Sequence, residues 1–247
     1  MKKNAKRKKE TKEEIRSRLM KKLDINPETA SDLETYQWYE KMEALDYISS
    51  RGYPTEAEFL VMAEILEEYA CTEYWEEAVT FLSYQALGYS EDALIKFLDL
   101  ACGRVVPWYV SGEKSTLFWA AREGELSLLR RMVEELDAPV NALYIDWGGD
   151  DEVGTVLSMA VKSGNLKLCR YLLDKGADPN FRLDEIEVPI AQAIKHNYVK
   201  IARLLLERGA TLDDLYCDDE PFDAFEFVRQ QGNEEMLRLL QKAKKPS

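Results

Sequence analysis

Nucleophilic catalysis with a histidine base would have to use the one histidine of this chain, His196. A Ser/His/Asp or Cys/His arrangement would depend on that residue as its base. The histidine follows a short apolar stretch, at the predicted end of a short helix, where an exposed surface residue is expected. The sequence holds no nucleophile elbow, no phosphate-binding loop and no dinucleotide-binding glycine pattern. We therefore expect a protein that is not an enzyme.

Metal chemistry would need cysteines, histidines or carboxylates at ligand spacing. The cysteines include no C-x-x-C pair; they are Cys71, Cys102, Cys169 and Cys217. The carboxylate cluster at 146–152, DWGGDDE, lacks the spacing of a calcium loop. The sequence thus predicts no metal, no cofactor and no small-molecule substrate. Cysteines without a pairing pattern indicate a reducing compartment, which is the cytoplasm, or the nucleus in a eukaryotic or viral setting.

Charge is divided unevenly along the chain, whose formal net charge is −13. Residues 1–22 hold eleven Lys or Arg and three Asp or Glu, and the remainder holds 22 basic and 43 acidic residues. An acidic body disfavours nucleic acid and anionic membranes and favours a basic partner. Only the arm at 1–22 could bind nucleic acid or a membrane, or direct nuclear import; the simpler interpretation is a solubilising tail. No apolar run approaches the length of about 18 residues that a membrane span needs, so none is expected.

The elements that would position functional residues come from a segment that recurs. Residues 155–180 align with residues 188–213 at an offset of 33. Residues 115–141 fit the same frame at an offset of 40, and residues 223–245 fit it at an offset of 35. One such segment cannot bury its apolar face alone, so neighbouring copies must stack.

The residues that match between copies are those a stack of helix pairs needs. Alanines 120, 160 and 193 are small enough for close helix packing, and glycines 176 and 209 can adopt the left-handed conformation that ends a helix. The copy at 155–180 has Thr155, Leu157, Ala160, Gly164 and the run Gly-Ala-Asp-Pro-Asn at its end. These residues resemble the ankyrin repeat, clearly over 115–214. The resemblance implies a module for recognising other proteins.

The expected fold is all-α, an ankyrin-like helical repeat solenoid with an N-terminal helical capping region. Capping boxes at Ser31 and Thr55 predict helices over 31–52 and 55–70, and a loose amphipathic helix is expected over 11–23. Residues 94–98 are expected to form the second helix of a degenerate repeat, and 223–243 a last helix. The expected segments are a basic, partly disordered arm (1–24), an N-terminal helical region (25–77), a degenerate ankyrin-like repeat (78–114), a repeat with a long finger insertion (115–153), two further repeats (154–187 and 188–220) and a C-terminal capping repeat (221–247).

Partner-binding residues follow from the resemblance, because one variable position of the first helix tends to face the concave side of an ankyrin stack. Four residues occupy that position: Trp119, Met159, Gln192 and Phe227. Tryptophan and methionine are frequent interface anchors. The alternative for Trp119 is packing beneath the preceding degenerate repeat.

The loops between repeats would project as fingers beside that concave side. The candidate contact residues in them are Tyr144, Trp147, Asp150, Asp151, Asp184, Glu185, Asp218 and Asp219. Carboxylates on three successive fingers would steer a basic partner and fix its register. The alternative is a solvated charge run without a partner.

The sequence therefore favours a monomeric, non-catalytic module that binds a basic protein. One concrete version is a toxin-neutralising immunity-type protein, which small acidic ankyrin-like proteins resemble. The other is an effector or viral ankyrin protein that binds a host factor, with the arm at 1–22 directing it to nucleic acid, a membrane or the nucleus.

Overall fold

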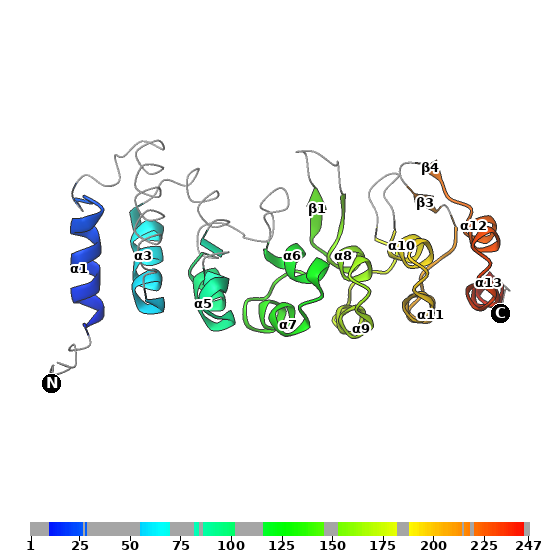
Figure 1. The fold of residues 1–247 in the computed structure, drawn as a ribbon, viewed down its shortest axis with the longest axis horizontal. Helices are drawn as coiled ribbons and strands as arrows, with labels where there is room; N and C mark the ends of the chain where they lie inside the picture. The colour runs from blue at the N-terminus through cyan, green and yellow to red at the C-terminus, as the bar shows by residue number, and fades with distance from the viewer. Residues whose placement is uncertain are drawn as a thin grey trace, which may run out of the picture. The chain divides into compact units, whose positions relative to one another are not determined.

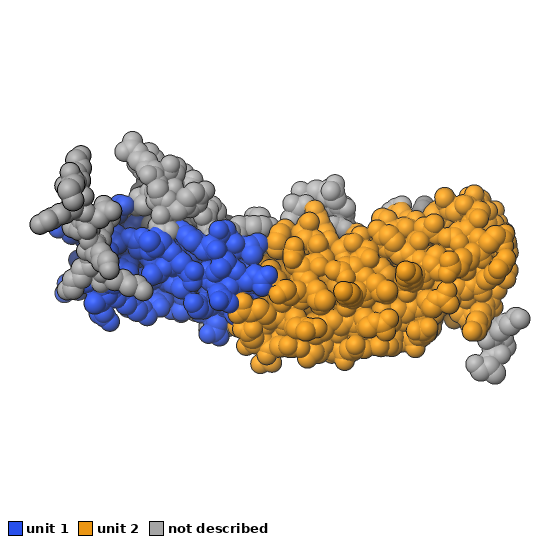
Figure 2. Space-filling view, turned by 60° about the horizontal axis from the view of Figure 1, so that its bottom comes forward, with its two compact units in different colours: residues 1–107 blue, residues 108–247 orange. Residues whose placement is uncertain are grey.

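The computed structural model describes residues 10–26, 28, 55–69, 82–83, 86–101, 116–145, 153–181, 188–213, 215–217 and 220–244. The chain divides into two compact units, residues 1–107 (unit 1) and 108–247 (unit 2), which Figure 2 shows in separate colours. The division falls inside the segment 78–114 that was expected to be one degenerate repeat. The helix expected over 31–52 lies outside the described residues.

Unit 1 contains three described helices, α1 (Lys12–Lys22), α3 (Glu56–Tyr69) and α5 (Glu91–Ala101). The helices expected over 55–70 and 94–98 are thus confirmed as α3 and α5. Helix α3 packs against both of the others (Figure 1). The ring of Phe59 on α3 lies 6.0 Å from that of Phe97 on α5, and both side chains are fully buried.

Helix α1 is a packed part of unit 1, although a loose helix was expected there. Thr11 begins it with a capping box, and Ile15 and Leu19 are buried. Its basic side chains reach carboxylates on α3 or just before α1. The ion pairs join Lys12 to Glu64 at 2.8 Å, Arg16 to Glu68 at 2.5 Å, and Arg18 to Glu58 at 2.5 Å and to Glu10 at 3.0 Å. Three basic residues of the arm, Lys12, Arg16 and Arg18, therefore have a structural role within unit 1.

Unit 2 is a stack of four helix pairs. The first helices of the pairs form the inner row, which is α6 (Thr116–Glu123), α8 (Val156–Lys162), α10 (Pro189–Lys195) and α12 (Ala224–Gln231). The second helices form the outer row, which is α7 (Leu126–Glu135), α9 (Leu166–Asp174), α11 (Val199–Glu207) and α13 (Glu234–Lys244). Figure 1 shows the two rows as two layers of helices. The fold is the expected all-α helical repeat solenoid.

Two short antiparallel hairpins extend from the inner row on the side away from the outer row (Figure 1). In the first, β1 (Leu143–Ile145) pairs with β2 (Val153–Thr155), and in the second, β3 (Tyr216–Cys217) pairs with β4 (Glu220–Pro221). They were expected only as finger loops. Thr155 ends β2 and also caps α8, because its side chain accepts a hydrogen bond from the amide of Ser158.

Each helix pair turns at a residue in the left-handed conformation. These residues are Gly124, Gly164, Asn197 and Gly232, with φ of 78°, 70°, 60° and 70°. Gly232 ends α12, so the prediction of one helix over 223–243 was wrong: two helices meet there. Two features disfavour a side chain at Gly164. Its φ is positive, and an added Cβ would lie 3.1 Å from the ring of Tyr198.

Asparagine side chains join successive repeats. Asn141 accepts a hydrogen bond from the amide of Asp178 at 2.9 Å and donates to the carbonyl of Gly176 at 3.2 Å. Asn180, at the end of the Gly-Ala-Asp-Pro-Asn run, repeats this arrangement with Thr211 at 2.9 Å and Gly209 at 2.8 Å. Each bridge satisfies backbone groups of the next repeat and so fixes the register of the stack.

Candidate protein-binding surface

The inner row presents one equivalent position from each helix pair. Trp119, Met159, Gln192 and Phe227 each precede the left-handed residue of their pair by five positions. They lie on α6, α8, α10 and α12, and each of these helices packs against the next. The alignment made from the sequence therefore places the four residues correctly in one row across unit 2.

The two ends of this row are accessible and its centre is covered. Trp119 and Phe227 are half-buried, whereas Met159 and Gln192 are only 2% and 1% exposed. A Cβ built on Gly154 would lie 3.3 Å from Met159 Cε, so strand β2 passes directly over that side chain. Met159 and Gln192 are thus not the exposed anchors that were expected, because the hairpin side of unit 2 covers them. Whether the row binds a partner stays a prediction.

Gln192 has an unusual environment for a glutamine. Its Oε1 is buried and has no hydrogen-bond partner among the residues that the structure describes, although α10 packs against strand β3. A buried carbonyl oxygen without a donor destabilises the fold. No pattern in the sequence indicated this feature.

Phe227 belongs to a small aromatic group at the base of the second hairpin. Its ring lies 5.2 Å from that of Phe222 at an interplanar angle of 59°. The amide of Phe222 donates to the carbonyl of Leu215 at 2.7 Å and closes the hairpin onto the repeat. Tilted aromatic pairs of this kind are favourable packing arrangements, and this one is half-buried.

Most of the predicted finger residues lie outside the described part of the chain. They are Trp147, Asp150, Asp151, Asp184, Glu185, Asp218 and Asp219. Tyr144 lies in β1, where its backbone pairs with Gly154. Among described acidic residues beside the second hairpin, Asp223 caps α12, and hydrogen bonds from the amides of Glu226 and Phe225 lower the pKa of its carboxyl.

The residues that could act chemically are dispersed. His196 is exposed at the end of α10, as expected, and stacks on Tyr198 with ring centroids 5.5 Å apart. Cys169 is fully buried on α9, and burial raises the pKa of its thiol to about 12, which makes it a poor nucleophile. The described residues contain no group of three His, Cys, Asp or Glu able to hold a metal ion. Within the same part of the chain, no helix has the length and apolarity to cross a bilayer.

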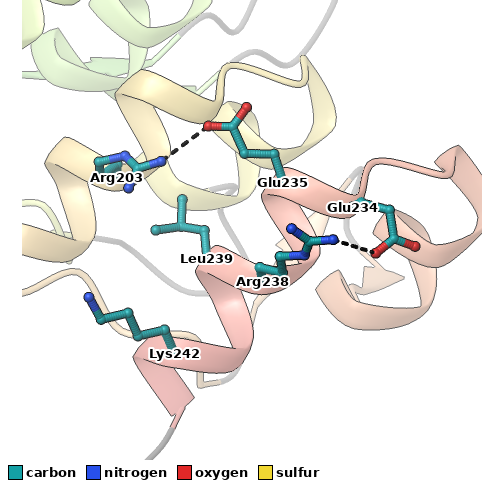
Figure 3. A pocket seen from close by; sticks show the side chains of 6 residues that line it. All are labelled: Arg203, Glu234, Glu235, Arg238, Leu239 and Lys242. Carbon is teal, nitrogen blue, oxygen red and sulfur yellow. Dashed lines mark hydrogen bonds and ion pairs between the residues drawn. The ribbon is translucent and has the colours of Figure 1, made fainter.

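The outer row has a shallow hollow of about 400 Å³ between α11 and α13 (Figure 3). Its lining consists of Arg203, Glu234, Glu235, Arg238, Leu239 and Lys242. Its lining includes two ion pairs. Arg203 on α11 pairs with Glu235 on α13 at 3.2 Å, and Arg238 pairs with Glu234 along α13 at 3.9 Å. This hollow was not predicted from the sequence.

Comparisons with known proteins agree with the stack of helix pairs. A family model described as "Ankyrin repeats (3 copies)" matches residues 82–183 and 117–216, which together span more than half of the chain. No curated protein matches significantly. Among solved structures, a chain in the complex of the predatory endopeptidase Bd0816 from Bdellovibrio bacteriovorus with immunity protein Bd3460 is 25% identical, with a TM-score of 0.45. That alignment covers 54% of the present chain and 65% of the other, less than two thirds of its length.

Proposed function

Because this chain belongs to the ankyrin-repeat family, whose members are modules for protein–protein interaction, we propose that it binds a basic protein along the inner row of unit 2. The observation that carries the proposal is the alignment of Trp119, Met159, Gln192 and Phe227 at one position of four stacked helices. The partner would lie across the row, between the hairpins, and the protein would act as a monomer without catalysis.

The half-exposed ends of the row are the proposed anchors. Trp119 on α6 and Phe227 on α12 stand at the first and last pairs of unit 2, so a partner that contacts both must span the whole row. Binding energy in protein interfaces is concentrated in a few aromatic side chains of this kind. The unpaired Oε1 of Gln192 would accept a hydrogen bond from a partner once the hairpin side opens around it.

Charge supports a basic partner. The segments between β1 and β2, between α9 and α10, and between α11 and α12 hold carboxylates at 146–152, 184–187 and 213–220. Carboxylates in this number attract a cationic protein over a distance and orient it as it approaches. They contribute more to the rate of association than to the lifetime of the complex.

The narrower form of the proposal is an immunity-type role, in which the protein neutralises a cationic toxin by covering its active site. Two aromatic anchors at the ends of a stack of helices, beside carboxylate-rich segments, suit that purpose. The alternative role in a host cell depends on the basic arm. Helix α1 already uses Lys12, Arg16 and Arg18 in ion pairs with α3, which leaves residues 1–9, outside the described part, as the segment for targeting.

Affinity capture from the native source tests the proposal. The baits are the wild type, the double variant Trp119→Ala/Phe227→Ala, and a control with two basic residues changed, Lys21→Gln/Lys22→Gln. We expect one basic protein that the wild type and the control retain and that the aromatic variant binds at least about 30-fold more weakly, a loss of about 2 kcal/mol. A partner held equally by all three folded baits would contradict binding along the inner row.

A further inference from the structure

The outer row carries a second repeating feature, which is an arginine at one equivalent position of every helix. Arg130, Arg170, Arg203 and Arg238 each follow the left-handed residue of their pair by six positions. All four are exposed. The stacking that aligns the inner row therefore also aligns four guanidinium groups along the opposite side of unit 2.

Further cations stand beside this ladder. Lys167 and Lys200 precede Arg170 and Arg203 by three residues, and Lys242 follows Arg238 by four, so each lies on the same helical face as its arginine. Arg170, Lys167, Lys200 and Lys242 have no ion-pair partner in the described part of the chain. These four charges are unpaired in a protein whose net charge is −13, so they are available to an anionic ligand.

The paired arginines also keep free donors. Arg203 uses its Nη2 for Glu235, and Arg238 uses its Nη2 for Glu234, while a guanidinium offers five N–H donors in all. Between the two arginines, Leu239 supplies an apolar patch in the hollow of about 400 Å³ (Figure 3). This part of the outer row combines positive charge with space for one apolar side chain.

The spacing of the ladder identifies the shape of the ligand. Packed helices lie about 8–10 Å apart, so arginines at one equivalent position of neighbouring helices should recur at about that step along the stack. A polypeptide in the polyproline II conformation has three residues per turn and rises about 3.1 Å per residue, so residues on one side recur about every 9 Å. Acidic segments favour such extended conformations because their charges repel one another.

We propose that the outer row of unit 2 is a second interaction surface that binds an extended acidic polypeptide with a carboxylate at every third residue and an apolar side chain in the hollow over Leu239. The carboxylates pair with Arg170, Arg203 and Arg238, and Lys167, Lys200 and Lys242 add attraction beside them. This surface is independent of the inner row and of the basic partner proposed for it.

Fluorescence anisotropy with a labelled synthetic peptide tests the proposal. The probe has 13 residues, a glutamate at every third position, a central leucine and small polar residues elsewhere. At about 50 mM salt, where charges are weakly screened, we expect saturable binding to the full-length protein that weakens as salt is added. A peptide of the same composition with its glutamates in one block should bind at least about threefold more weakly, because it cannot place one carboxylate on each helix.

The matched variants are Arg170→Gln/Lys200→Gln on the outer row and Lys21→Gln/Lys22→Gln on α1, which remove the same charge from exposed, unpaired positions. We expect the first to weaken peptide binding about fivefold and the second to change it less than twofold. The proposal would be overturned if both variants bound the peptide with equal affinity. It would also be overturned if the wild type bound the peptide with its glutamates in one block, or a 20-nucleotide single-stranded nucleic acid, as tightly as the peptide with spaced glutamates. Absence of binding to the wild type at 50 mM salt would overturn it as well.

Discussion

The buried glutamine on α10 gives a prediction whose size can be worked from the structure. Gln192 is 1% exposed, and its Oε1 has no hydrogen-bond partner. Leaving a buried carbonyl oxygen unpaired costs about 1–3 kcal/mol. Methionine has a similar length and volume and requires no donor, so Gln192→Met removes this cost and leaves no cavity. We expect the free energy of unfolding of unit 2 to rise by about 1 kcal/mol, the lower end of that range, since the swap also repacks the site.

A urea titration that reports on unit 2 alone measures the change. Cys169 is fully buried on α9, so its reaction with a thiol reagent, in a chain whose other cysteines are serine, follows the opening of unit 2. With a slope of about 2 kcal/mol per molar urea, the midpoint should rise by about 0.5 M. The same substitution at Gln241, which is exposed on α13, should leave the midpoint unchanged. An unchanged or lower midpoint for Gln192→Met would refute the reasoning, because it would mean that Oε1 has a partner in solution.

Two further substitutions test the contacts that join neighbouring elements. Asn180→Ala removes both hydrogen bonds to the next repeat and should lower the stability of unit 2 by about 1 kcal/mol, as measured by the Cys169 titration; a midpoint that stays at the wild-type value would argue against a role in register. In unit 1, burial raises the pKa of Glu58, but hydrogen bonds from Thr55 and Arg18 outweigh it and hold the pKa below its ordinary value. That carboxylate therefore stabilises the fold above about pH 4.3, the pKa of an unfolded glutamate, and the contribution is lost as pH falls through the lower folded value. Glu58→Gln should abolish this part of the loss of helicity as the pH falls from 6 to 3. If the helicity of the variant depends on pH as that of the wild type does, the contact between Glu58 and Arg18 does not contribute to stability in solution.

The helix pairs of unit 2 could be predicted because each one repeats its own signals. A glycine or asparagine stands at each turn, an alanine lies four residues before it in three of the first helices, and Gly-Ala follows two of the second helices. Gly232 shows the limit of local pattern, since the apolar spacing continues across it and only the equivalence to Gly164 and Asn197 indicates a break.

The burial of Met159 and Gln192 could not be predicted, because it depends on the strands that lie over them. Their position was inferred correctly from the repeat, but strand β2 is only three residues long and gives no recognisable alternation in the sequence. The chain turns where β2 leads into α8, and this turn places Gly154 over Met159. The ion pair between Lys12 and Glu64 could not be predicted for another reason, because 52 residues separate the two.

The arginine ladder is different, since its spacing was present in the sequence. Arg130, Arg170, Arg203 and Arg238 have the same offsets as the turn residues, so an alignment of exposed positions would have found them. The carboxylates of the loops are clustered in the sequence, whereas these arginines lie 33 to 40 residues apart and become a group only when the repeats are aligned.

Hydrogen–deuterium exchange on the complex with the captured basic partner tests the central claim most directly. The account predicts that the partner slows amide exchange in α6, α8, α10 and α12 and at the strands of the two hairpins, while exchange in α7, α9, α11 and α13 stays as in the free protein. Protection confined to the outer row, or to unit 1, would contradict the claim that the inner row is where this protein binds its partner.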